Sequence, residues 1–277
     1  MTRQEAETIY VLRLSNALMK LFATALLVLS ALLLFHFAHW NASLRLASGA
    51  PARNAVLVEL FTSEGCSSCP PADTLLGNLR QDLAGHGFQV IPLGFHVDYW
   101  NSLGWRDRFS SAAFSHRQEQ YAQALHIDGP YTPQLVIDGA TELVGSDRAR
   151  AHAAIAEAAT RGLEAEIDLS QSAPEKLELK VTSKMNGAAV MLAITEDNLS
   201  TRIGAGENNG RELHHAAVVR ELRQLGIIQN GSLTTSATLA PEKDWKPADL
   251  RAIIFVQQAG AGKILGAASV PLHGQQR

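Results

Sequence analysis

The strongest apolar segment of the chain lies near its start. Residues 21–38 are apolar at all but three positions, and basic residues precede them. A helix of this length spans about 27 Å, close to the hydrocarbon thickness of a bilayer, and no polar stripe marks it as a buried core helix. We therefore expect residues 1–50 to be a signal peptide, or a membrane anchor followed by a linker. Either alternative places the remainder outside the cytoplasm: secreted, in the periplasm, or tethered to the inner membrane through residues 21–38.

Residues 51–162 alternate between strand-like and helix-like patterns. Short apolar runs predict strands at 55–62, 88–95, 134–138 and 141–144, and helical spacing predicts helices at 70–83, 106–125 and 145–161, the last capped by Ser146. Pro92 weakens the second strand assignment, because proline cannot donate to a sheet ladder. The order of strand, helix, strand, helix, strand, strand, helix favours an α/β domain in which helices flank a mixed sheet.

After residue 162 the pattern becomes that of β-structure. Alternating or β-rich runs predict strands at 164–169, 176–182, 188–194, 232–239, 252–257 and 263–270. Residues 213–225 fit either a helix or a strand, and we favour the strand because its surroundings are all β. Several strands at this spacing favour an all-β, sandwich-like domain over residues 163–277.

Composition narrows the class of protein. The 277 residues suggest about two domains, and 24 Lys+Arg against 27 Asp+Glu leave a net charge of −3. Since there is no global positive field, we expect no nucleic-acid partner. Cys66 and Cys69 are the only cysteines in the sequence. Two cysteines exclude a disulfide scaffold and a four-thiolate zinc site.

The two cysteines form a Cys-Ser-Ser-Cys motif that directly follows a predicted strand and opens a predicted helix. Free N–H groups and the positive end of the helix dipole at such a position stabilise a thiolate at Cys66. That thiolate can attack a substrate disulfide, and Cys69, one turn along, can resolve the mixed disulfide. The motif therefore predicts a redox-active disulfide and a thiol–disulfide oxidoreductase whose partner is a protein or small-molecule thiol or disulfide. No organic cofactor and no metal is implied.

The same residues leave other functions open. The cysteines could be a buried, inert pair in a non-catalytic interaction protein. They could also bind zinc or copper, with His96 or the pair His214 and His215 as further ligands. A thiol peroxidase is less favoured, because no residue pattern identifies a peroxide-activating arrangement.

Three segments carry a resemblance to a known family. They read VLVELFTSEGCSSCPPAD, VIPLGFHVDYWNSLGWRDRFS and YTPQLVIDG. Together they resemble the thioredoxin superfamily over residues 54–161, and more closely a thioredoxin-like family of exported bacterial proteins described as a domain of unknown function. That closer family also includes the β-rich second half. The combined motifs are more specific for the fold than for a reaction.

The resemblance implies roles for residues outside the motif. Thr132-Pro133 matches the loop whose cis-proline faces the two cysteines, so Pro133 would shape the groove and the backbone of Thr132 would pair with an extended peptide. An ordinary trans loop proline is the alternative. Glu59 resembles the buried acid that assists proton transfer, and burial would raise its pKa. Alternatively, Glu59 is an outward-facing strand residue.

This sequence also departs from the thioredoxin pattern. The loop before Cys66 is one residue longer, Gly65 stands where an aromatic residue is usual, and Ser67-Ser68 replaces Gly-Pro. These differences leave the redox potential and the direction of the reaction open.

A second group of polar residues follows the second predicted strand. His96 and Asp98 are two positions apart, so on an extended chain they share one face, at the strand end where open α/β sheets bind ligands. They could form a proton relay or the rim of a peptide site, with Trp100 as an apolar contact and Tyr131 completing the surface. A hydrogen-bonded loop with packed aromatic rings is the alternative. We treat Ser63 and Glu64 as turn residues, and His214 and His215 as structural or exposed.

Overall fold

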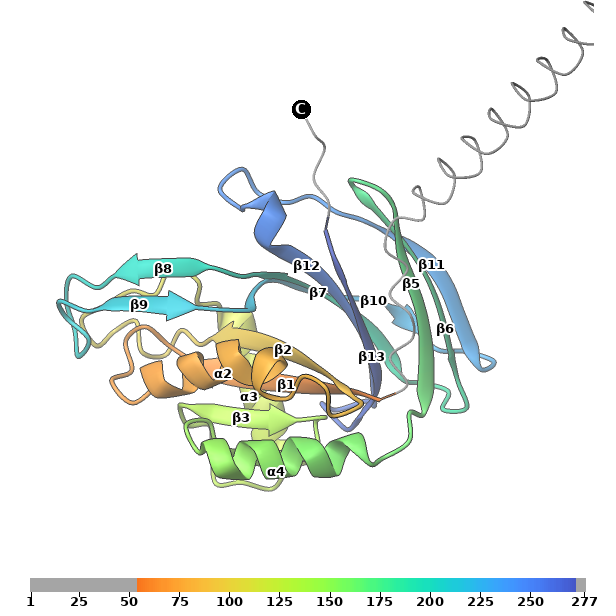
Figure 1. Ribbon diagram of the computed structural model, residues 1–277, viewed down its shortest axis with the longest axis horizontal. Helices are drawn as coiled ribbons and strands as arrows, with labels where there is room; N and C mark the ends of the chain where they lie inside the picture. Colours follow the sequence, from red (N-terminus) through yellow and green to blue (C-terminus); the bar gives the residue numbers. More distant parts are fainter. Residues whose placement is uncertain (1–53, 273–277) are drawn as a thin grey trace, which may run out of the picture. The chain divides into compact units, whose positions relative to one another are not determined.

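The structure is a computed structural model that describes residues 54–272. The first half contains β1 (Ala55–Thr62), α2 (Pro70–Asp82), β2 (Gln89–His96), α3 (Ala112–Ala124), β3 (Gln134–Ile137), β4 (Thr141–Val144) and α4 (Arg148–Ala159). This is the order of elements predicted for this half (Figure 1). The expected export or anchor segment, residues 1–50, lies outside the described residues. Between residues 54 and 272, no helix has the length and apolar character needed to cross a membrane.

Two helix boundaries differ from the prediction because of local capping. Helix α3 begins after Ser111, whose hydroxyl accepts a hydrogen bond from the amide of Ala113, so the expected start at 106 is wrong. Helix α4 begins after Asp147, whose carboxylate caps its first turn, and not after the predicted cap Ser146. In both cases a side chain that satisfies a free helical N–H defines the start of the helix.

The second half consists of strands. They are β5 (Ala165–Ala173), β6 (Lys176–Ser183), β7 (Ala189–Glu196), β8 (Leu199–Arg202), β9 (Glu212–His215), β10 (Val218–Ile227), β11 (Ser232–Thr238), β12 (Leu250–Gln257) and β13 (Ile264–Pro271), with a 3₁₀ turn at Pro247–Asp249. The single strand predicted at 213–225 is divided into β9 and β10, because Ala217 adopts a positive φ of 52° that an extended strand does not allow. Strand β8 was not predicted.

The sheet topology shows that the prediction of a separate all-β, sandwich-like domain over residues 163–277 is wrong. One eight-stranded sheet runs in the order β13-β12-β7-β10-β2-β1-β3-β4, so four strands of the second half continue the sheet of the first half. A three-stranded sheet, β11-β6-β5, packs on this extension through a shared apolar cluster. Strands β8 and β9 form a small separate hairpin. In residues 54–272 the protein is therefore a mixed α/β structure without a separate all-β domain.

Pro92 lies inside β2, at the centre of the large sheet. Strand β10 pairs with β2 at Val218 and Gly94, and the amide of Gly94 donates to the carbonyl of Ala217 at 2.7 Å. Backbone groups two residues apart in a strand face the same side, so the nitrogen of Pro92 also faces β10. No pairing with β10 is present at that position, and the missing N–H therefore costs no ladder hydrogen bond.

Alternate side chains of β1 enter two different layers. Leu57 and Phe61 point toward α3, where Phe61 stacks on Phe95. Val58 and Leu60 point the other way and pack against α2 and α4. Helix α2, which begins directly after Cys69, therefore covers one face of the sheet, and α3 covers the opposite face.

Candidate functional site

The two cysteines form a disulfide where the chain leaves β1 and enters α2. The Cα atoms of Cys66 and Cys69 are 5.4 Å apart, within the usual range for a disulfide. Cys69 is the residue before the first helical position, so the prediction that the pair opens a helix is confirmed. Both cysteines are completely buried, although Ser67 and Ser68 between them are exposed.

The expected free N–H groups at the start of α2 are not available. Pro70 and Pro71 occupy the first turn and have no N–H. The amides of Ala72 and Asp73 both donate to the carbonyl of Cys69. The polar group beside the sulfur of Cys66 is instead the hydroxyl of Ser68, at 3.3 Å.

The peptide bond between Thr132 and Pro133 is cis, as the resemblance implied. Pro133 lies close to the first turn of α2. A Cβ atom placed on Gly145 would lie 3.2 Å from the Cβ atoms of both Ala72 and Pro133, and 2.7 Å from a methyl group of Leu60. Gly145 therefore lets the proline loop approach α2 one turn after Cys69.

Trp100 joins the cysteine loop to the proline loop. Its indole N–H donates to the Thr132 hydroxyl at 2.9 Å. A Cβ atom on Gly65 would lie 3.1 Å from the Cβ of Trp100, so glycine leaves the space that Trp100 occupies. Tyr131, the next predicted surface residue, donates its hydroxyl to Glu142. The structure thus brings Trp100, Thr132 and Pro133 together around the disulfide.

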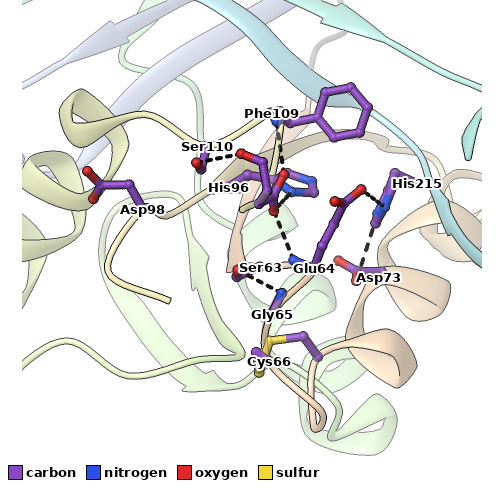
Figure 2. Close-up of polar contacts among 12 residues, drawn as sticks. Ser63, Glu64, Gly65, Cys66, Asp73, His96, Asp98, Phe109, Ser110 and His215 are labelled. Atoms are coloured by element: carbon purple, nitrogen blue, oxygen red, sulfur yellow. Dashed lines mark hydrogen bonds and ion pairs between the residues drawn. A yellow bond between two sulfur atoms is a disulfide. The ribbon is translucent and has the colours of Figure 1, made fainter. Parts of the chain in front are cut away.

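A buried polar cluster lies behind the disulfide, and Glu64 is at its centre (Figure 2). The Glu64 carboxylate contacts Nε2 of His215 at 3.2 Å and accepts a hydrogen bond from the indole of Trp105 at 2.8 Å. The Glu64 amide donates to Asp107 at 2.9 Å. Our interpretation of Glu64 as a turn residue was therefore incomplete, and His215 is structural but also part of this cluster.

The second pair in the cluster is His96 with Asp107. Nδ1 of His96 lies 2.6 Å from the Asp107 carboxylate, and both side chains are buried. Asp107 also accepts a hydrogen bond from the amide of Phe109 at 2.9 Å. The rings of His96 and His215 meet edge to face with centroids 4.9 Å apart, and Phe109 packs against both rings.

The predicted common face of His96 and Asp98 does not form. Strand β2 ends at His96, so the alternation of an extended chain does not continue to Asp98. The Asp98 carboxylate accepts a hydrogen bond from Ser115 at 2.5 Å and lies away from the cluster in Figure 2. Asp107, from the following loop, is the carboxylate that pairs with His96.

Asp73 connects the cluster to the start of α2. One oxygen of its carboxylate lies 4.0 Å from Nδ1 of His215, and its amide donates to the carbonyl of Cys69 at 3.1 Å. Residues four apart on a helix lie on the same face, and this spacing from Cys69 is a signal that could have identified Asp73. Sequence reasoning missed it.

The charges of the cluster shift its acids and bases in different directions. Burial raises the pKa of Glu64, but hydrogen bonds, led by that with His215, outweigh burial and leave the pKa below its ordinary value. Burial also raises the pKa of Asp107, yet attraction to His96 leaves it lowered. Burial lowers the pKa of His96, and Asp107 more than compensates and raises it. For Asp73, burial dominates and raises the pKa.

Glu59 lies in the layer against α3 and outside this cluster. It is fully buried, so the outward-facing alternative is wrong. Its carboxylate accepts hydrogen bonds from Nε of Arg117 at 2.6 Å and from the hydroxyl of Tyr121 at 2.5 Å. Arg117 also donates to Gln257 at 3.1 Å. A complete ion pair therefore holds the residue that we expected to assist proton transfer.

The loop between β8 and β9 adds residues that the sequence did not indicate. Asn208 is buried, and its side-chain amide donates to the carbonyls of Glu64 and Cys66, each at 2.9 Å. Glu207 accepts a hydrogen bond from the amide of Ser67 at 3.1 Å. These residues lie about 140 positions from the cysteines in the sequence, so no local spacing could have found them.

The zinc and copper alternatives gain no support from the geometry. Within residues 54–272, no group of three or more His, Cys, Asp and Glu side chains is arranged to hold a metal ion. His96 and His215 do approach each other, but each of them pairs with a carboxylate of the cluster.

The chain belongs to the family described as "Protein of unknown function (DUF1223)", whose model matches residues 57–257. This match covers parts of both halves of the chain. The fold is similar to that of protein AGR_C_4864 from Agrobacterium tumefaciens, with 24% identity, a TM-score of 0.63, and coverage of 83% of this chain and 99% of that chain. A domain of the outer membrane lipoprotein Omp28 from Porphyromonas gingivalis is 10% identical over 41% of this chain and 92% of that chain. Its TM-score of 0.25 is too low to indicate a shared fold. No curated protein matches.

Proposed function

We propose that this member of the DUF1223 family is a thioredoxin-like thiol–disulfide oxidoreductase that acts through Cys66 and Cys69. The observation that carries the proposal is the disulfide between β1 and α2, with cis-Pro133 close to the first turn of the same helix. Two further features support it: Trp100 occupies the space beside Gly65, and it binds Thr132 of the proline loop.

The arrangement of elements around the disulfide supports the thioredoxin-like part of the proposal. Strands β1 and β2 are parallel and joined by α2, and β3 and β4 form an antiparallel hairpin that pairs with β1. Helices cover both faces of these strands. In this arrangement the cysteines lie at the carboxyl end of β1, where open α/β sheets place their binding sites.

The reaction would proceed by two exchanges. A thiolate of a substrate dithiol attacks Sγ of Cys66, the Cys66–Cys69 bond breaks, and its electron pair passes to Sγ of Cys69, which takes up a proton. The second substrate thiolate then attacks the substrate sulfur of the mixed disulfide and displaces Cys66. The substrate dithiol is oxidised to a disulfide, and the protein gains two electrons. The reverse sequence reduces a substrate disulfide.

Six of the predicted site residues have a place in this proposal. Cys66 is the nucleophile, Cys69 resolves the mixed disulfide, and Thr132 and Pro133 form the groove for an extended substrate. Trp100 and Tyr131 line the approach to the groove. Glu59 has no part in it, because Arg117 and Tyr121 occupy its carboxylate.

The compartment and partner follow from the same chemistry. We propose that residues 1–50 deliver the protein outside the cytoplasm, by cleavage or by a tether through residues 21–38. We also propose that the partner is a protein or small-molecule thiol or disulfide. An oxidised cysteine pair suits such a compartment, since cytoplasmic thiols are kept reduced.

A redox titration of the full-length protein tests this proposal. The protein is equilibrated in glutathione or dithiothreitol buffers, quenched in acid, denatured and alkylated, and the two redox forms are counted by mass. We expect a reversible two-electron transition. The Cys69→Ser variant should trap a mixed disulfide with a peptide dithiol that has been oxidised, and Cys66→Ser should trap much less.

A structural disulfide in a non-catalytic interaction protein is the second candidate, and the complete burial of both cysteines favours it. It predicts that the disulfide stays oxidised across the buffer series while the protein is folded. That result, together with no trapped mixed disulfide, would contradict the oxidoreductase.

A further inference from the structure

A loop that lies about 140 residues after the cysteines in the sequence packs against the cysteine motif. Residues 203–211 connect β8 to β9, and their side chains contact the cysteine loop. Cys66 and Cys69 have no exposed surface, although exposed serines lie between them. A thiol must reach Sγ of Cys66 along the bond axis for exchange to occur, so the closed structure does not permit the reaction.

Asn208 makes the buried contact of this loop. Its side-chain nitrogen donates to the carbonyls of Glu64 and Cys66, each at 2.9 Å. Nη1 of Arg211 donates to the Asn208 oxygen at 3.0 Å, which directs the nitrogen toward the two carbonyls. Both polar atoms of the Asn208 side chain are therefore hydrogen-bonded, the nitrogen to the cysteine motif and the oxygen within the loop.

Other contacts of the loop are at its margin. The exposed side chain of Glu207 accepts a hydrogen bond from the amide of Ser67 at 3.1 Å. Gly206 has a φ of 71°, and a Cβ atom there would lie 3.1 Å from the Cβ of Trp105, so the loop also packs on the residue that binds Glu64. The neighbouring Asn209 is exposed, and its side chain forms no hydrogen bond with the described part of the chain.

The loop occupies main-chain groups that a polypeptide could use. These are the carbonyls of Glu64 and Cys66, through Asn208, and the amide of Ser67, through Glu207. An extended peptide carries N–H donors and carbonyl acceptors that can replace both kinds of contact. A small thiol without an amide group cannot, and it must wait for the loop to open by itself.

We propose that Asn208 is a specificity-determining residue, which holds the 203–211 loop over the Cys66–Cys69 disulfide and so selects polypeptide dithiols over small thiols. The selection deepens the oxidoreductase function proposed above and rests on it. The effect of the loop on access to the disulfide can be measured as the rate of its reduction by a small thiol, without any catalytic turnover.

The decisive experiment compares Asn208→Ala with Asn209→Ala in the full-length protein. The rate at which dithiothreitol reduces the disulfide is followed by acid quench, alkylation and mass. Two hydrogen bonds of this kind shift an opening equilibrium by roughly tenfold or more, so Asn208→Ala should be reduced about tenfold faster than wild type. Asn209→Ala, a matched change in the same loop, should stay within about twofold. Equal rates for wild type and Asn208→Ala would overturn the proposal.

Folding is controlled in the same experiment. The urea midpoint of each variant is measured, and a rate gain no larger than the accompanying loss of global stability would also overturn the proposal. If Asn208→Ala does not fold, Asn208→Asp replaces it. A carboxylate is nearly the same size and cannot donate to two carbonyls, so the same acceleration is expected.

A second arm separates this proposal from the function on which it rests. Wild type and Asn208→Ala are compared with a peptide dithiol and with dithiothreitol, and the preference for the peptide should fall in the variant. Faster reduction of the variant without any peptide turnover in either form would support the control of access by the loop. It would contradict the oxidoreductase function. Peptide turnover with an unchanged preference would support the oxidoreductase and overturn the role of Asn208.

Discussion

Two glutamates near the end of β1 are both fully buried, and their surroundings differ. Glu59 lies against α3 and pairs with a guanidinium, that of Arg117, and with the hydroxyl of Tyr121. Glu64 follows the strand and pairs with an imidazole, that of His215, and with the indole of Trp105. The first carboxylate lies on the side of β1 that faces α3, and the second belongs to the cysteine loop.

The difference lies in the kind of base that compensates each buried acid. A guanidinium stays charged at every accessible pH, so the cation beside Glu59, that of Arg117, does not change with pH. An imidazole can change charge near neutral pH, so the cluster that contains Glu64 responds to pH through His96, which pairs with Asp107. The protein therefore carries a cation of constant charge beside Glu59 and a base of variable charge, His96, in the cluster that contains Glu64.

The largest expected effect comes from breaking the ion pair between Glu59 and Arg117. Arg117→Met leaves the Glu59 carboxylate buried without its cation, and losing one partner of a buried pair costs about 3–5 kcal/mol of unfolding free energy. Urea unfolding followed by circular dichroism at pH 7 measures the loss. The double variant Glu59→Gln/Arg117→Met, which carries no buried charge at this site, should recover more than half of it. A loss below about 1 kcal/mol in the single variant would contradict the interpretation.

The next effect is a pH-dependent change in stability that comes from the pair of His96 and Asp107. The raised pKa of His96 means that its pairing with Asp107 contributes fully below pH 6.5 and is lost as pH rises through the folded pKa. His96→Phe should therefore cost about 1–3 kcal/mol below pH 6.5 and less at higher pH. Urea unfolding from pH 5 to 9 measures the difference, and a cost independent of pH would refute the assignment.

The acids of the cluster act at the other end of the pH range. The lowered pKa values of Glu64 and Asp107 mean that their contribution is present at neutral pH and is lost as pH falls through the folded values. The same unfolding series, extended below pH 4.5, should therefore show a second fall in stability.

Asp73 should show a smaller effect of opposite sign. Its pKa is raised by burial, so the folded state holds the proton more strongly than the unfolded state, and charging it at neutral pH is unfavourable. Asp73→Asn should stabilise the protein at pH 7 by about 0.5–2 kcal/mol, the usual size of a favourable single substitution. The gain should disappear below pH 3.8. A destabilised variant at pH 7 would mean that His215 depends on the Asp73 charge.

The smallest effect is expected at the margin of the loop. Glu207 is exposed and its pKa is lowered by its contacts with Ser67, so it places a negative charge beside the cysteine motif. Glu207→Gln should raise the alkylation rate of reduced Cys66 at pH 7 less than about threefold, because a nearby anion disfavours the thiolate. The difference should vanish near 1 M salt, where screening acts within about 3 Å. Persistence of the difference at high salt would point to a packing effect.

Sequence patterns predicted the first half of the fold well. Strands β1 and β4 occupy the predicted residues, and the order of elements through α4 is as expected. These elements are short and bounded by local signals such as the prolines at the start of α2. Most strands of the second half were predicted, but their assembly into sheets was not. Alternation indicates which side chains are buried and does not indicate which strands are neighbours.

The candidate site divides in the same way. Cys66, Cys69 and the cis bond before Pro133 lie in local motifs, and the structure contains all three features. Asn208 and His215 reach the site across about 140 to 150 residues. No single-sequence spacing relates them to Cys66, because their placement depends on the β8–β9 hairpin folding back onto α2.

The sequence by itself determined a dithiol at the start of a helix, because the motif, the preceding strand and the helical spacing are all local. It also determined a net charge of −3, with no overall positive charge. Only the tertiary structure decided that the two halves share one sheet and that Glu64 belongs to the buried cluster while Glu59 is held by Arg117. It also decided that a loop distant in the sequence contacts the cysteine motif. Each of these depends on contacts between segments far apart in the chain, which burial and hydrogen bonding select together.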